Sequence, residues 1–359
     1  MRVLVTGALG SIGMASVRAL IALGHHVRTF DLHSRASERR VRILGNGVDV
    51  HWGDIRSAEQ VAAAVADQDA VIHLAAILFP ESEADPGLSR EVNVGGTRNV
   101  LAAMRAGPRQ PALVYPSSIA VYGAGRFGGA PRRASDPVSP GTHYSHHKVA
   151  CEEMTRSSGV PWTILRVGAA IEPGASAKIT PLALQTMLGV SLETRIEWIH
   201  PLDVGRAAAN AIERPEARSN TWMIGGGPAC RATQRDFFAT AFESVGVGMF
   251  PDEAFGSGTF EMDWMETEES QRALEFQRHS WSDFHADFQL KMRLHRWALL
   301  PLRPIVQRSL VQRGLVHASL RWQDRAQSHG PSASLRAGRG AVSASAPPRD
   351  PILGSRPSR

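Results

Sequence analysis

The sequence predicts an α/β fold built on a doubly wound parallel sheet, and three observations support this prediction. Residues 3–5 are an apolar run of the kind found in a buried parallel strand. Gly7, Gly10 and Gly13 follow and open a helical segment that extends to residue 23. Beyond it, apolar strand patterns alternate with helical patterns through the first 166 residues.

The glycines between the first strand and the first helix form a predicted phosphate site. The start of a helix offers free N–H groups and a partial positive charge, and glycines let a pyrophosphate approach the backbone closely. Spaced glycines alone are a weak signal, so their position between a strand and a helix carries the argument. The alternative is an ordinary glycine-rich turn.

The second predicted strand, residues 26–30, ends at Asp31. In dinucleotide-binding folds an acidic residue about 20 positions beyond the glycine turn binds the ribose hydroxyls. A carboxylate there also repels a 2′-phosphate, so Asp31 favours NAD over NADP. Arg28 and Arg35 lie close enough in sequence to weaken that preference. The alternative for Asp31 is a solvated strand end.

The remaining pattern completes the sheet. Further strands are predicted at 48–52, 70–74, 112–115, 160–166 and 220–224, with helices at 88–105, 142–157, 202–213 and 233–245. Residues 119–140 are rich in glycine, proline and arginine and are predicted to be a loop at the rim of a site.

Tyr144 and Lys148 lie four positions apart on one predicted helix and therefore share a face. A phenol has an ordinary pKa of about 10, and an adjacent ammonium is expected to lower it. The phenol then exchanges a proton with a substrate alcohol or carbonyl, while Ser118, at the end of the preceding strand, holds the same oxygen. The alternative is a chance pair on a surface helix.

Composition narrows the class of protein. The 359 residues are 43% hydrophobic and 21% charged, enough for one large α/β domain with additions. The two cysteines, Cys151 and Cys230, form no disulfide framework, and no Cys/His cluster suggests a metal site. A strand beginning at residue 3 leaves no room for a signal peptide, and no apolar run is long enough to span a membrane, so we expect a cytoplasmic protein. No nucleic-acid-binding motif is visible.

Several segments, taken in order, resemble an extended short-chain dehydrogenase/reductase of the NAD-dependent epimerase/dehydratase type. The resemblance covers about the first half of the chain. Its motifs are residues 6–13 (TGALGSIG), 53–55 (GDI), 73–76 (HLAA), 93–97 (NVGGT), 117–123 (SSIAVYG), 144–148 (YSHHK) and 165–166 (LR).

The resemblance implies a role for each matching residue. The pyrophosphate would be held by Gly7, Gly10, Ser11, Ile12 and Gly13, the ribose by Asp31, and the adenine by Asp54 and Ile55; Leu74, Ala75 and Ala76 would line the cofactor channel, and Tyr144 and Lys148 would also contact the cofactor. Ser118 would be the catalytic serine, with Ser117 as the fallback, Tyr144 the acid/base, and Lys148 the group that binds the nicotinamide ribose. Two departures stand out: Val167 replaces the usual proline after Arg166, and His146 and His147, expected on a solvated helix face, fill the Tyr–Lys motif.

We predict four regions: an NAD-binding domain of Rossmann type (1–166), a substrate-binding region interleaved with the last sheet elements (167–288), a basic amphipathic extension (289–326) and a disordered tail (327–359). The segment 167–198 is short for a sugar-nucleotide enzyme. Together with Trp162, Trp198, Trp222 and Met187, it suggests a smaller or more apolar substrate, although a core position is the favoured interpretation for each aromatic side chain taken singly.

Three functions follow. The first is an NAD(P)-dependent oxidoreductase that transfers a hydride between NAD and a secondary alcohol or ketone of a small or apolar substrate. The second is an NAD-dependent sugar-nucleotide epimerase or dehydratase with no net redox change. The third, a non-catalytic NAD-binding regulatory protein, is opposed by the complete set Ser118, Tyr144 and Lys148. The resemblance implies a homodimer, and the extension 289–326 suits either contact with an anionic membrane surface or packing on protein.

Overall fold

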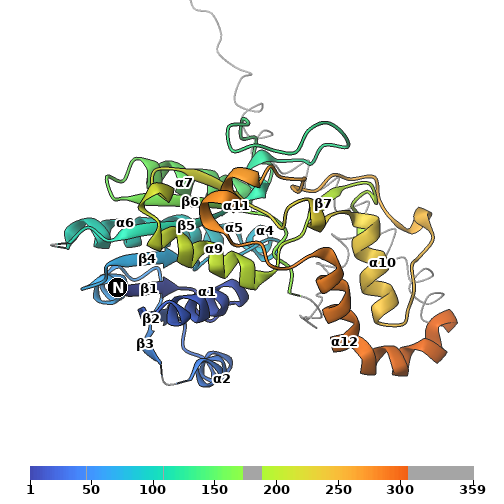
Figure 1. The fold of residues 1–359 in the computed structure, drawn as a ribbon, viewed down its shortest axis with the longest axis horizontal. Helices are drawn as coiled ribbons and strands as arrows, with labels where there is room; N and C mark the ends of the chain where they lie inside the picture. Colours follow the sequence, from blue (N-terminus) through green and yellow to red (C-terminus); the bar gives the residue numbers. More distant parts are fainter. Residues whose placement is uncertain (46, 108, 173–187, 306–359) are drawn as a thin grey trace, which may run out of the picture.

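The computed structural model describes residues 1–305 except 46, 108 and 173–187. At its centre is a seven-stranded sheet in the order β3-β2-β1-β4-β5-β6-β8, with every neighbouring pair parallel (Figure 1). The strand order reverses between β1 and β4, as in a doubly wound Rossmann-type sheet. The predicted fold class is therefore confirmed. The strands are β1 (Arg2–Thr6), β2 (His26–Asp31), β3 (Val48–Trp52), β4 (Ala70–His73), β5 (Ala112–Ser118), β6 (Trp162–Val167) and β8 (Thr221–Ile224).

Helices cover both faces of the sheet because successive strand residues point to opposite sides. Val3 and Val5 pack toward one face and Leu4 toward the other. The first face is covered by α1 (Ser11–Ala22), α9 (Pro201–Glu213) and α11 (Glu268–Leu274), the second by α3 (Ala58–Val65), α6 (Gly96–Ala106) and α7 (His143–Arg156). All three of these strand residues are fully buried, which explains why β1 is a continuous apolar run.

The single helix predicted at 88–105 is instead three helical segments. The structure has α5 (Pro86–Arg90), a π-helical turn (Glu91–Gly95) and then α6. Inside the π turn, the Asn93 side chain accepts a hydrogen bond from Ile77 N (2.7 Å) and donates one to Ile77 O (2.9 Å). The irregular turn thus fixes the backbone that follows β4. The sequence pattern did not predict α2 (Arg35–Leu44) or the short α4 (Glu81–Ala84).

The C-terminal part adds a small subdomain beside the sheet. β7 (Arg195–Glu197) pairs antiparallel with β9 (Arg231–Thr233), and α10 (Gln234–Ser244) and α12 (Trp281–Leu299) lie together at the end of the molecule far from β3 (Figure 1). Short 3-10 turns lie at Ile119–Tyr122, Pro215–Ala217, Pro228–Cys230, Asp252–Ala254 and Leu300–Leu302. In the described part of the chain, no helix has the length and apolar character needed to cross a membrane.

The boundary predicted between residues 288 and 289 is wrong, because it falls inside α12. Phe284 and Met292, on either side of it, are both buried on the same helix, and Phe284 packs in one cluster with Trp198 and Phe238. The apolar contacts that end the subdomain therefore continue past residue 288. Residues 306–326 of the predicted extension and the predicted tail 327–359 lie outside the described residues.

A buried histidine links three elements near the site. His73, at the end of β4, is 2% exposed, with Nδ1 2.7 Å from Thr6 Oγ1 and Nε2 3.0 Å from Thr97 Oγ1. Thr97 Oγ1 donates to Asn93 O, so the proton between His73 and Thr97 belongs to Nε2. Burial lowers the pKa of His73 to about 3, and the imidazole is neutral at physiological pH.

This shift predicts a loss of stability in mild acid. The unfolded chain binds the His73 proton near pH 6.5 and the folded chain only near pH 3, so the contribution to stability is complete above pH 6.5 and declines as the pH falls below it. We expect the free energy of unfolding to fall by about 2 kcal/mol more in the wild type than in His73→Asn between pH 7 and pH 5. Urea titrations at the two pH values measure this, and equal losses in both proteins would contradict it.

Candidate active site

A cavity of about 780 Å³ lies at the carboxyl ends of the strands, where the strand order reverses. Ligands bind at this position in open α/β sheets. The cavity is lined by every residue that the sequence singled out as a site residue: Gly7, Gly10, Ser11, Ile12, Gly13, Asp31, Asp54, Ile55, Leu74, Ala75, Ala76, Ser118, Tyr144 and Lys148. The fold therefore brings together residues that are spread over 142 positions of the sequence, from 7 to 148.

The glycine turn leaves no room for side chains at its closest contacts. Gly7 has φ +64°, and a Cβ on it would lie 2.7 Å from Ala75 N; a Cβ on Gly13 would lie 2.2 Å from Gly7 O. Gly10 is the N-cap of α1 and has no side chain to bind the first N–H groups of the helix. The turn is thus shaped to place backbone N–H groups against an anion, which fits the pyrophosphate of NAD.

Asp31 is fixed between the glycine turn and the end of β2. Its Oδ2 accepts a hydrogen bond from Leu9 N and its Oδ1 one from Leu32 N, both at 2.9 Å. The carboxylate lines the cavity and keeps lone pairs for ribose hydroxyls. It is therefore not merely a solvated strand end.

The arginines near Asp31 differ from those expected. Arg28 binds Asp49 (2.7 Å) and three carbonyls before and after the end of α3, and neither it nor Arg35 lines the cavity. Arg40 and Arg56 line it instead. Arg40 was not predicted as a site residue, because the helix α2 that presents it was not predicted.

The adenine end of the cavity combines Asp54, Ile55 and Arg56. Arg56 Nη2 lies 2.6 Å from Asp54 Oδ2, and this pairing lowers the pKa of Asp54. Ile55 is buried against Gly96, where an added Cβ would come within 2.8 Å of its side chain. The motif at 53–55 is thus held in place by packing on α6 and by a local ion pair.

Two carboxylates from distant segments bind the start of α7, the helix that carries Tyr144. Glu83 accepts hydrogen bonds from His143 N (3.0 Å) and Tyr144 N (3.1 Å). Glu261 accepts from Gly141 N (2.8 Å), from the backbone and side chain of Thr142 (3.1 and 2.8 Å) and from Ser145 Oγ (2.9 Å). Carboxylates are favourable at this end of a helix, because the helix dipole places partial positive charge there.

The three catalytic candidates meet in the cavity. Ser118, the fallback Ser117 and Tyr144 all line the cavity, and Ser118 Oγ accepts a hydrogen bond from Ala120 N (3.2 Å). Lys148 is buried, its Nζ donates to Pro116 O (2.7 Å), and the same atom lies 5.7 Å from the centre of the Tyr144 ring. The structure thus brings together the three groups that the sequence predicts to position an oxygen, exchange its proton and supply a nearby positive charge.

The expected direction of the Tyr144 pKa is wrong for this structure. Burial raises the pKa of Tyr144 to about 12, partly opposed by the hydrogen bond with Ser118. Burial likewise lowers the pKa of Lys148 to about 8. Desolvation disfavours both charged forms, and it outweighs the mutual benefit that the spacing of the two residues suggested.

The two histidines of the motif differ from one another. His146 is exposed, as expected for a solvated helix face. His147 is 8% exposed, with Nδ1 3.5 Å from Asn93 Nδ2, and burial lowers its pKa. The expectation of a solvated face is therefore wrong for His147, because the π turn packs against this side of α7.

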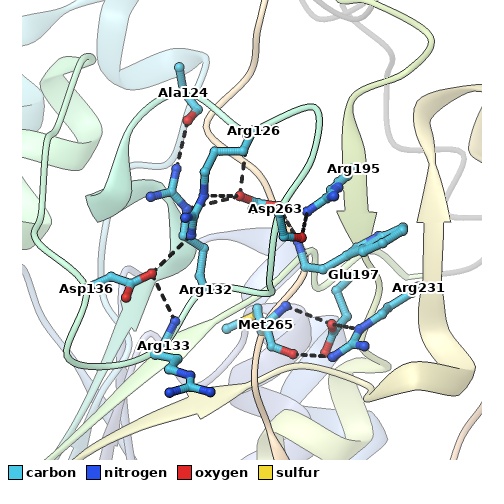
Figure 2. Close-up of polar contacts among 12 residues, drawn as sticks. Ala124, Arg126, Arg132, Arg133, Asp136, Arg195, Glu197, Arg231, Asp263 and Met265 are labelled. Atoms are coloured by element: carbon cyan, nitrogen blue, oxygen red, sulfur yellow. Dashed lines mark hydrogen bonds and ion pairs between the residues drawn. The ribbon is translucent and has the colours of Figure 1, made fainter.

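Sequence reasoning missed one wall of the cavity, residues 260–262. Figure 2 shows Arg126, Arg132 and Arg195 converging on the buried carboxylate of Asp263, at 3.4, 3.0 and 3.5 Å. This ion-pair cluster anchors the wall to the loop 123–136. No periodicity or motif in the sequence marks it, since the partners come from three separate segments.

A second buried carboxylate holds the next residues of the same segment. Glu197, in β7, accepts from Met265 N (2.9 Å) and Arg231 Nε (3.0 Å), and Arg231 Nη2 donates to Met265 O (2.7 Å) (Figure 2). The loop 123–136 and the β7–β9 pair therefore fix this wall from two sides.

Part of the cavity lining is apolar. Leu78, Phe79, Ile171, Phe260 and Met262 contribute to it, with Glu261 between the last two, and the rings of Phe79 and Phe260 meet edge to face with centres 5.2 Å apart.

The tryptophans that suggested an apolar substrate do not contribute to this surface. Trp198 and Trp222 are core residues, and Trp162 packs against the core under α6 and α7. Met187 lies outside the described residues.

The chain belongs to the NAD dependent epimerase/dehydratase family, whose sequence profile matches residues 3–225. This confirms the resemblance drawn from the motifs, and it agrees with the predicted cofactor, NAD, and with an enzyme of the short-chain dehydrogenase/reductase type.

Known proteins similar to this chain carry out different reactions. The human 3 beta-hydroxysteroid dehydrogenase type 7 is 40% identical over 125 residues, 33% of each chain. A UDP-glucose 4-epimerase from Azospirillum brasilense is 34% identical over 193 residues, 51% of this chain and 53% of the relative. A dTDP-glucose 4,6-dehydratase from Streptomyces venezuelae, solved with NAD and DAU bound, superposes with a TM-score of 0.68 at 23% identity over 84% of this chain and 100% of that one.

These likenesses support the fold and the family rather than one reaction. The chain spans about one third to one half of the length of the curated relatives named above. The structural likeness, at 23% identity, carries the fold alone.

The position of Asp31 predicts a change in cofactor preference. In Asp31→Ala, the carboxylate that repels a 2′-phosphate is gone, while Arg40 and Arg56 remain in the cavity lining. We expect the ratio of the Kd for NADP to the Kd for NAD to fall at least about tenfold, which corresponds to about 1.4 kcal/mol. Calorimetric titration with both dinucleotides measures the ratio.

Asp49→Ala is the matched control, because Asp49 is a carboxylate on the adjacent strand that does not line the cavity. Its ratio should stay at the wild-type value. An unchanged ratio in Asp31→Ala would show that Asp31 does not select the cofactor.

Proposed function

We propose that the protein is an NAD-dependent oxidoreductase that interconverts a secondary alcohol and a ketone on a small or apolar substrate. NAD, when bound, supplies the acceptor or donor of the hydride. Membership of an NAD-dependent family and the glycine turn shaped for a pyrophosphate support the cofactor. The substrate class rests on the apolar part of the cavity lining, which includes Phe79, Phe260 and Met262.

The side chains divide the work at the reacting oxygen. Tyr144, whose pKa of about 12 keeps it protonated, is suited to donate a proton to a ketone oxygen. Ser118 lines the same cavity, lies near enough to Tyr144 to lower its pKa in part, and is suited to hold the substrate oxygen. For alcohol oxidation Tyr144 must first lose its proton, which becomes easier as the pH rises. We therefore assign proton transfer to Tyr144 and positioning to Ser118.

The lining of the substrate end argues against a sugar nucleotide. A nucleotide diphosphate requires cationic or N–H donors for its phosphates. In the described part of the chain, Phe79, Phe260 and Met262 bound this end, and the carboxylate of Glu261 is already engaged by four hydrogen bonds to the start of α7. An apolar carbon skeleton fits these walls better than a charged one.

Replacing the acid/base tests the mechanism. Tyr144→Phe removes the hydroxyl that exchanges the proton but leaves the cavity shape nearly intact. We expect kcat to fall at least about a hundredfold, with the Kd for NAD changed less than about threefold. The measurement is NADH formation with a panel of apolar secondary alcohols, alongside calorimetric titration of NAD.

Tyr122→Phe is the matched control, because Tyr122 is a buried tyrosine outside the cavity lining. It should retain turnover. Full activity in Tyr144→Phe would overturn the proposed mechanism. Conversion of UDP-sugars without NADH accumulation would instead favour the epimerase or dehydratase reaction for which some relatives are named.

A further inference from the structure

The helix α12 has two apolar faces, and only one of them is covered. Phe284, Phe288 and Met292 recur at a spacing of four and pack into the C-terminal subdomain. On the opposite side, Leu290, Leu294 and Trp297 align at i, i+4 and i+7. They are 64%, 73% and 83% exposed, and they form what we call the outer stripe of α12.

This stripe is not an ordinary scatter of surface residues. A tryptophan that is 83% exposed leaves most of a large apolar ring in water. Leu300 and Ile305, 48% and 67% exposed, extend the apolar surface beyond the end of the helix. An exposed apolar surface of this kind marks a binding region.

Cations flank the outer stripe on both sides. At 100° per residue, Arg293 falls to one side of the stripe and Lys291 to the other. Lys291 also lies 3.7 Å from Glu172, a half-exposed surface pair of the kind that contributes little energy. The acidic residues of α12, Asp283 and Asp287, lie in its first two turns, and from residue 288 to 323 the sequence has lysine and arginine but no acidic residue.

We propose that the outer stripe of α12 docks on an anionic lipid bilayer surface. Leucine and tryptophan side chains enter the boundary between headgroups and acyl chains, while flanking lysine and arginine side chains reach the lipid phosphates. Tryptophan is enriched at this depth because its ring is apolar and its N–H is polar. The helix lies flat on the surface, with its covered face toward the protein.

The size of the stripe favours a lipid surface over a second copy of the chain. A stable protein interface buries roughly 800 Å² on each partner, and its fully buried centre is poor in charged residues. The outer stripe is a narrow line of three side chains on a single helix, and cations border it within the same two turns. A planar anionic surface satisfies both features, since it accepts a narrow apolar ridge and attracts the cations beside it.

Other side chains of α12 connect the helix to the candidate active site. Lys291 pairs with Glu172, and Glu172 Oε2 accepts a hydrogen bond from Ser11 Oγ (3.0 Å) in the cofactor turn. Phe284 packs on Trp198, whose Nε1 donates to Ile171 O (2.8 Å), and Ile171 lines the cavity. Docking through α12 would therefore hold the cavity close to the lipid surface.

Vesicle co-sedimentation of the full chain tests the proposal. The probes are phosphatidylcholine vesicles with and without phosphatidylserine, at low salt. We expect binding to the anionic vesicles, and the double variant Leu294→Ser/Trp297→Ser should bind at least about tenfold more weakly. Both side chains are exposed, so the variant should unfold at the wild-type temperature.

The double variant Ile43→Ser/Phe127→Ser is the matched control, because these side chains are 63% and 58% exposed and lie away from α12. It should bind vesicles like the wild type. If Leu294→Ser/Trp297→Ser bound the anionic vesicles as tightly as the wild type, the binding would come from basic residues without the outer stripe, and the proposal would be overturned. The same holds if no vesicle binds, or if sedimentation velocity shows that the stripe instead joins two copies of the chain.

Discussion

The hydrogen bonds at the start of α7 are the interaction on which the geometry of the site depends. Glu83, from the segment that follows β4, and Glu261, from the C-terminal part, both bind the first turn of the helix that carries Tyr144. The helix dipole favours both charges. Burial nevertheless raises the pKa of Glu261, so its charge depends on the four donors around it. The catalytic helix is thus fixed at the same point to the cofactor half and to the substrate half.

Buried charges help to fix the wall beside this helix. Asp263 and Glu197 are each nearly fully buried; Asp263 pairs with three arginines and Glu197 with Arg231, and both accept hydrogen bonds from backbone N–H groups. Removing Arg231, or the Asp263 carboxylate, would leave buried charge without its partner, which costs far more than an ion pair itself contributes. Such a cluster specifies one arrangement of the segment 260–265, and with it the position of Phe260 and Met262 in the cavity.

The cofactor half could be predicted closely, because its determinants are local in sequence. A Cβ on Gly13 would lie within 3 Å of Gly7 and Ala8 in the same turn, and Tyr144 and Lys148 share a face through the period of one helix. The substrate half could not be predicted in this way, because Glu261, Asp263 and their partners meet only through tertiary contacts. The predicted direction of the Tyr144 pKa shift was wrong for a similar reason. Spacing predicts the neighbouring charge but not the burial that outweighs it. Likewise, a tryptophan side chain such as Trp198 could contact an apolar substrate, but Trp198 is buried in the core.

The difference between the cofactor half and the substrate half also limits what the relatives can show about the substrate. The family profile ends at residue 225, whereas Phe260, Glu261 and Met262 line the cavity beyond it. Relatives named as dehydrogenase, epimerase and dehydratase all resemble this chain, so the resemblance does not select one of these reactions. The choice among those reactions depends on which substrate the substrate half of the cavity binds and on the orientation of that substrate relative to the cofactor. In this chain Phe260 and Met262, on a wall held by Asp263 and Glu197, line the cavity beyond the family profile, and the proposed substrate class rests on these residues rather than on the family.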